Sequence, residues 1–175
     1  EHPAILNTLS ELMIEGFSVT LLAPNTEGVV SEEDIAQAMG PDVCAVSLMA
    51  VNNEVGTVQP FQEAARLAHE AGALFHTDAV QGAGHVAIDI EAMGIDMLSV
   101  SAHKFHGPKG VGLLACRDQA FGEPLAPVSL ILGGGQERGR RAGTENVPGI
   151  VGLAAALKEA NRDLPRYQEE VSALR

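Results

Sequence analysis

The chain has 175 residues, of which 46% are hydrophobic and 19% are charged, so it can bury the core of one ordinary domain. A disordered chain would be poorer in apolar residues and richer in charge. Asp and Glu outnumber Lys and Arg by 23 to 11, and the resulting net charge of −12 argues against a general nucleic-acid surface and against binding to an anionic membrane.

Helices and strands are predicted to alternate through the first half of the chain. Apolar residues spaced three, four and seven apart predict a helix over 3–15. A short β-type run follows at 17–22, and a helix with acidic residues in its first turn is expected over 32–39. Residues 43–51 are nearly continuously apolar, as in a strand covered on both faces, and 61–68 carry one apolar helical face.

The second half continues the alternation with three short strands, a helical turn and two helices. The strands are expected at 73–76, 97–101 and 111–116, the turn at 90–93, and the helices at 147–160 and from 164 onward. Strands that alternate with helices predict an α/β domain with a mostly parallel sheet. We see no internal repeat and no second domain in the sequence.

Polar clusters follow the predicted strands, where ligands bind in open α/β sheets. Residues 52–54 (Asn-Asn-Glu) follow one strand, 77–81 (Thr-Asp-Ala-Val-Gln) another, and 101–104 (Ser-Ala-His-Lys) a third. A fourth cluster, 133–144, is rich in glycine and carries the densest positive charge of the chain. These clusters are the candidate site.

Lys104 and Asp78 favour pyridoxal 5'-phosphate (PLP) as a cofactor. A partly buried lysine becomes a nucleophilic amine that can form a Schiff base, and an aspartate can keep the pyridinium nitrogen of PLP protonated. Hydroxyls, backbone N–H groups and positive charge in the fourth cluster would suit the phosphate. On its own, an Asp and Lys pair is as readily a salt bridge, so the interpretation depends on the whole set.

Four segments together resemble the cysteine desulfurases, which are fold-type I PLP enzymes of the class V aminotransferase group. The segments are Asn52 to Thr57, His76 to Gln81, Ser101 to Gly110, and Gly133 to Asn146. The resemblance implies a three-layer fold-type I PLP-dependent transferase large domain. It also implies that residues 1–175 are only part of that domain, with the N-terminal part and the C-terminal small domain absent.

The resemblance assigns most of the candidate residues to the cofactor. Lys104 would be the lysine that binds PLP, and Asp78 would pair with the pyridinium nitrogen. Gln81 and Asn53 would hydrogen-bond near the phenolic oxygen of the ring. The family's phosphate-binding residues correspond to Ser101 and His103.

Two further assignments come from the same resemblance. Thr144 matches a threonine that reaches the PLP phosphate of the other subunit, which implies a homodimer. His2 matches a histidine that stacks on the ring and moves protons, so the catalytic residues implied are Lys104 and His2. The family converts L-cysteine to L-alanine, and the sulfur passes through an enzyme persulfide to acceptor or scaffold proteins for iron–sulfur cluster or thio-cofactor assembly.

The family's nucleophilic cysteine and its substrate-binding arginine are expected beyond Arg175, so this segment alone should not desulfurate cysteine. Cys44 and Cys116 are expected to be small core residues rather than nucleophiles. Two cysteines make no disulfide framework, and with no long apolar run the sequence predicts a cytoplasmic protein. The alternatives are a selenocysteine lyase, a related class V aminotransferase, or a non-catalytic PLP-binding fragment.

Other interpretations of single residues carry less weight. We expect no metal site, because no Cys or His pair has zinc spacing, and no nucleotide P-loop, because 133–135 lack the Gly-Lys-Ser/Thr ending. His76 is expected to be a hydrogen-bonded histidine at a strand end, and His69 and His85 to be solvated. The arginines of 138–141 suggest a local anion or subunit contact rather than a nucleic-acid patch, given the acidic background.

Overall fold

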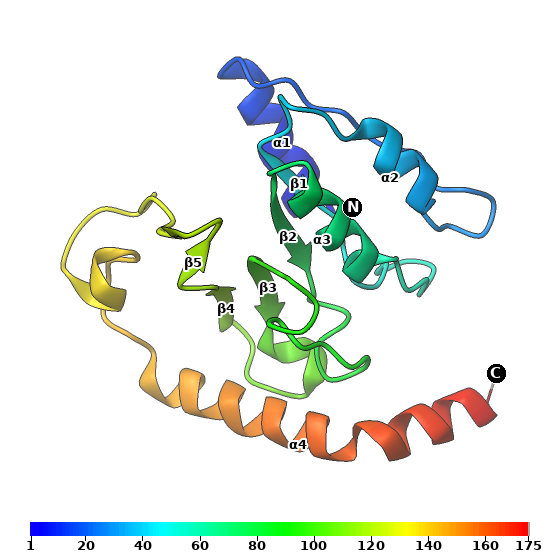
Figure 1. The fold of residues 1–175 in the computed structure, drawn as a ribbon. Coiled ribbons are helices and arrows are strands. Elements are labelled where there is room, and N and C mark those ends of the chain that lie inside the picture. Colours follow the sequence, from blue (N-terminus) through cyan, green and yellow to red (C-terminus); the bar gives the residue numbers. More distant parts are fainter. Residues whose placement is uncertain (175) are drawn as a thin grey trace.

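The computed structural model describes residues 1–174 (Figure 1). The helices are α1 (Pro3–Ile14), α2 (Glu32–Ala38), α3 (Phe61–Glu70) and α4 (Val147–Ala173), with 3₁₀ turns η1 (Ala102–Phe105) and η2 (Gln136–Gly139). The strands are β1 (Ala45–Ser47), β2 (Leu74–Asp78), β3 (Met97–Ser101), β4 (Gly112–Cys116), β5 (Gln119–Ala120) and β6 (Glu123–Pro124). The expected alternation of helices and strands is confirmed.

Four strands form the main sheet in the order β1-β2-β3-β4. The first three run parallel, with Ser47 opposite His76 and Asp78 opposite Ser99, and β4 returns antiparallel to β3. The prediction of an α/β fold with a mostly parallel sheet is therefore confirmed. The carboxyl ends of β1, β2 and β3 meet at one edge, which we call the carboxyl edge.

The core lies between the sheet and α3. Phe75 and Thr77 of β2 are completely buried, and so are three alanines of the helix, Ala64, Ala65 and Ala68. Small side chains allow the helix axis to approach the strands closely, and α3 packs on both β1 and β2. The alternation along β2 then points His76 and Asp78 toward the other face of the sheet.

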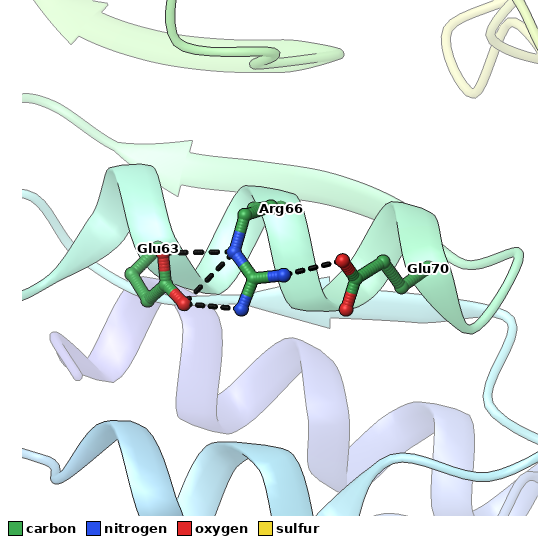
Figure 2. Close-up of polar contacts among 3 residues, drawn as sticks. All are labelled: Glu63, Arg66 and Glu70. Carbon is green, nitrogen blue, oxygen red and sulfur yellow. Dashed lines mark hydrogen bonds and ion pairs between the residues drawn. The ribbon is translucent and has the colours of Figure 1, made fainter.

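The outer face of α3 is polar and carries an exposed ion-pair row (Figure 2). Arg66 pairs with Glu63 one turn before it and with Glu70 one turn after it. The guanidinium holds the pKa of Glu63 below its usual range, because a hydrogen bond from Arg66 favours the charged carboxylate. Such exposed pairs contribute little stability, so α3 is held mainly by its apolar face.

Two predicted strands differ from the structure. Residues 17–22 form no strand, and Phe17 and Leu21 are exposed, because no neighbouring strand within residues 1–174 offers them a pairing partner. The strand predicted at 43–51 is reduced to β1, although Leu48 and Ala50 still donate backbone hydrogen bonds to β2 beyond its end. That strand is also not covered on both faces, since Ala45 is exposed.

The two C-terminal helices of the prediction are a single helix, α4, with Pro165 inside it. Proline lacks an N–H and normally ends or kinks a helix. Here the second half of α4 is held by contacts with the loop after β2: Gln168 donates to the carbonyl of His85, and Tyr167 packs edge-on against the His85 ring. Figure 1 shows α4 running beneath η1.

Candidate active site

Three connections gather the candidate residues at the carboxyl edge. Asp78 is the last residue of β2, and Ser101 is the last residue of the adjacent parallel strand β3. The chain passes directly from Ser101 into η1, which carries His103 and Lys104. The structure therefore brings the carboxylate and the amine that the sequence predicts to neighbouring strand ends.

The turn η1 presents Lys104 to solvent. The Lys104 amine makes no hydrogen bond or ion pair within residues 1–174, so it is free to contact a ligand. Next to it, the Ser101 hydroxyl and the His103 Nδ1 are 2.9 Å apart. Gly107 closes the turn, where a Cβ atom would lie only 2.8 Å from the Ala102 carbonyl oxygen, so this position requires glycine.

Asp78 is buried but retains an unused oxygen. Its Oδ1 accepts a hydrogen bond from the Val80 N–H at 2.9 Å, whereas Oδ2 accepts none in the described part of the chain. A buried carboxylate fixed by one oxygen and open at the other can accept a hydrogen bond from a cationic N–H. This is the geometry that a pyridinium nitrogen requires.

The start of the chain also reaches the carboxyl edge. His2 caps α1, because its Nδ1 accepts a hydrogen bond from the Ala4 N–H at 3.1 Å. Glu1 accepts from the Met49 N–H at 2.6 Å, just beyond β1. Burial raises the pKa of the Glu1 carboxyl, and the nearby negative charge of Asp78 adds to that effect. Sequence reasoning missed Glu1, and its only signal was its position beside His2.

The remaining predicted residues lie on loops. Asn53 is half-buried in the turn after β1, where its side chain donates to Glu54, and Gln81 is half-buried in the turn after β2. Thr144 is exposed between η2 and α4. Figure 1 shows that segment beyond the β4 side of the sheet, apart from the ends of β2 and β3. The structure thus brings every candidate except Thr144 onto the carboxyl edge.

Three histidines outside the predicted site, His69, His76 and His85, are half-buried. His76 is hydrogen-bonded, as expected, to Ser47 and Ser99. His69 is not simply solvated, because its Nε2 lies 2.8 Å from Oδ2 of the buried Asp96. The prediction is also wrong for His85, whose pKa is lowered by burial and by the nearby His106.

The two cysteines differ from each other. Cys44 is exposed, so the prediction that it is a core residue is wrong. It lies just before the shortened strand β1, where the backbone has not yet entered the covered part of the sheet. Cys116 is half-buried at the end of β4, and burial raises the pKa of its thiol, which makes it a poor nucleophile.

Residues 1–174 contain neither a metal-binding cluster nor a membrane-spanning helix. No group of three or more His, Cys, Asp or Glu side chains there is arranged to hold a metal ion. None of the helices in that range has the length and apolar character that crossing a bilayer requires.

Comparison with known proteins identifies the family of the chain. Residues 1–171 match the aminotransferase class-V family, and the chain belongs to it. The expected cofactor is confirmed with the family, since its members depend on PLP.

The relatives and solved structures include several cysteine desulfurases. The chain is 51% identical over its whole length to cysteine desulfurase IscS of Clostridium botulinum and 46% identical to cysteine desulfurase NifS of Azotobacter vinelandii. It spans 43% and 42% of those two proteins. A structure described as a NifS-like protein superposes with a TM-score of 0.87 at 45% identity, covering 95% of this chain and 45% of that one. SspA in complex with cysteine gives 0.83, also at 45% identity, covering 90% and 45%.

The residues present fit the cofactor of this family. Asp78 offers a buried carboxylate with one free oxygen, and Lys104 offers an amine without an ion-pair partner in residues 1–174. Ser101 and His103 add a hydroxyl and a ring nitrogen at the start of η1. A base for the ring nitrogen, an amine for the aldehyde and polar groups for the phosphate are thus all provided at one edge of the sheet.

Proposed function

We propose that the protein containing this chain is a PLP-dependent cysteine desulfurase. It would convert L-cysteine and an enzyme thiol to L-alanine and an enzyme persulfide: the C–S bond of cysteine breaks, an S–S bond to the enzyme sulfur forms, and a proton equal to the one that the enzyme thiol loses is added to the β-carbon that becomes the alanine methyl group. The observation that carries the proposal is that Asp78, with one carboxylate oxygen without a partner, and Lys104, with an amine without a partner in residues 1–174, follow adjacent parallel strands at one edge of the sheet. The names of the relatives support the choice of substrate.

Each candidate residue has a defined task in this proposal. Bound PLP supplies an electron sink for the substrate's α-carbon. Asp78 Oδ2 accepts a hydrogen bond from the ring nitrogen and keeps it charged. The Lys104 Nζ holds the cofactor and carries a proton to and from the reacting centre.

The other residues orient the cofactor. Ser101 and His103 bind its phosphate, while Asn53 and Gln81 hydrogen-bond at the ring oxygen. His2 would cover the ring face. Its Nδ1 is occupied by the α1 cap, so Nε2 is the atom that could exchange a proton.

The proposal extends to the assembly and location of the protein. Thr144 lies on an exposed loop apart from the other candidates, which supports a role in a second subunit's site and hence a homodimer. The sulfur would pass to an acceptor or scaffold protein for iron–sulfur cluster or thio-cofactor assembly. The nucleophile would be a cysteine outside residues 1–175, since Cys44 lies at the amino end of β1, away from the carboxyl edge, and Cys116 is half-buried with a raised pKa. Two cysteines without a disulfide support a cytoplasmic location.

The test is turnover of L-cysteine by the full-length gene product that contains this chain. We expect the absorbance of bound PLP, and borohydride should attach the cofactor covalently to Lys104. With a reducing thiol present, alanine and sulfide should form in equal amounts. Lys104→Ala should lose both properties. Lys109→Ala, which removes another exposed lysine five residues away, should keep them. Bound PLP without alanine formation from cysteine would refute the desulfurase. Product formed only from selenocysteine would instead indicate a selenocysteine lyase, and product formed only with a keto-acid acceptor would indicate an aminotransferase.

A further inference from the structure

His76 is held between two serines on the strand that carries Asp78. Its Nδ1 lies 2.9 Å from the Ser47 hydroxyl of β1, and its Nε2 lies 2.9 Å from the Ser99 hydroxyl of β3. Both ring nitrogens are thus occupied by neighbouring strands. His76 precedes Asp78 by two residues, so the two side chains share one face of the sheet, about 7 Å apart along the strand.

The surroundings of His76 favour its neutral form. Burial lowers its pKa, which the charge of Asp78 only partly opposes. The flanking strands present serine hydroxyls, which can donate to one ring nitrogen and accept from the other. Asp78 is the one charged group that acts on the pKa of His76 within residues 1–174. In the same row of the sheet, Met97 lies opposite His76 and the half-buried Cys116 lies opposite Met97, while Glu1 lies near Asp78 and Lys104 is on the exposed turn after β3.

We propose that His76 is a positioning residue for Asp78: neutral at pH 7 and above, and hydrogen-bonded to Ser47 and Ser99, it fixes the β2 end without competing for the Asp78 charge, whereas in acid it would compete. This inference depends on the proposed role of Asp78 toward the ring nitrogen of PLP. A cationic His76 would attract the same carboxylate and repel the charged ring. Because His76 is neutral between the two serines, the Asp78 carboxylate remains able to accept a hydrogen bond from the cofactor.

Two conservative variants test the inference in the full-length gene product. His76→Asn retains an amide in place of Nδ1, and His76→Gln retains one in place of Nε2, so each can keep one serine contact while losing the ability to become charged. The measurement is the dissociation constant of PLP between pH 5.5 and pH 8.5. His85→Gln is the control, because it removes another histidine whose pKa burial lowers, on the loop that contacts α4.

At pH 8.5 we expect the parent protein and both His76 variants to bind PLP within about twofold of each other. Toward pH 5.5 the parent should weaken more than either variant. Full protonation of His76, about 7 Å from Asp78, would raise the dissociation constant of PLP between about threefold and fiftyfold, depending on the effective dielectric constant. The His85→Gln control should weaken like the parent.

Two results would overturn the inference. One is a ratio of parent to variant affinity that is the same at every pH, since a purely structural contact has no such acid dependence. The other is failure of both variants to fold, which would make His76 a structural residue. Asp78→Asn tests the premise separately: unchanged PLP affinity and absorbance in that variant would remove the role of Asp78 itself.

Discussion

Asp96 gives the sharpest prediction about stability, because its carboxylate contacts β2, α3 and also Arg117, which follows β4 and lies 3.7 Å from Oδ1. It is 1% exposed, and its Oδ2 accepts from the Phe75 N–H of β2 and lies against His69 of α3, each at 2.8 Å. Asp96→Ala would leave the Phe75 N–H buried without a partner and remove two charge-assisted contacts. Losses of this kind sum to roughly 3 to 5 kcal/mol in the free energy of unfolding.

Thermal unfolding of the chain, followed by circular dichroism at pH 7.5, measures this cost. For a protein of this size, roughly 3 to 5 kcal/mol corresponds to a fall of about 6 to 20 °C in the midpoint. His69→Ala removes only one partner of the Asp96 carboxylate and should lower the midpoint by about a third of the shift expected for Asp96→Ala. Glu63→Ala breaks an exposed ion pair on the same helix and should leave the midpoint nearly unchanged. The reasoning fails if Asp96→Ala shifts the midpoint no more than Glu63→Ala does.

Three further predictions follow from other parts of the structure. Gly84 has a φ of +77°, and a Cβ there would lie 2.8 Å from the Ala160 Cβ of α4. Gly84→Ala should therefore lower the free energy of unfolding, measured by urea titration, by about 1 to 3 kcal/mol. An unchanged urea midpoint would contradict this packing. Burial keeps the pKa of His76 below the ordinary 6.5, so the unfolded chain takes up the proton first and stability falls as the pH drops below about 6.5. Urea midpoints from pH 5.5 to 8 should show a shallower fall in His76→Asn, and parallel profiles would contradict the shift. Iodoacetamide should modify the exposed Cys44 before Cys116, because burial raises the pKa of the Cys116 thiol. Peptide mass spectrometry can follow both modifications, and equal rates at the two cysteines would be inconsistent with that burial.

Local sequence patterns predicted the elements whose partners also lie in the chain. The strands at 73–76 and 97–101 were found because each pairs with a neighbour in residues 1–174 and buries alternate side chains. The run at 17–22 has the same β-type composition but no such partner, and it forms no strand. Composition sets the propensity for a strand, whereas hydrogen bonding to a second segment decides whether one forms.

Helix boundaries depended on distant contacts in the same way. The sequence predicted separate helices at 147–160 and from 164 onward, and Pro165, at the start of the second, normally ends or kinks a helix. In the continuous α4, Tyr167 and Gln168 contact His85, which lies more than eighty residues earlier, and these contacts stabilise the helix beyond Pro165. No window of sequence around Pro165 contains that information, so the error follows from the tertiary contact.

The candidate site was more predictable than the boundaries, and the topology explains the difference. In a parallel sheet, any polar residue directly after a strand lies at the carboxyl edge, whatever the detailed length of that strand. Asp78, Ser101 and Lys104 therefore come together even though the first strand of the sheet was predicted too long. Glu1 and His76 could not be found this way. One reaches the edge through a contact with Met49, and the other lies inside a strand, where only the register with Ser47 and Ser99 shows what surrounds it. Residues proposed to act on a ligand directly can thus be predicted from the sequence, whereas residues proposed to position them become apparent only once the strands are paired.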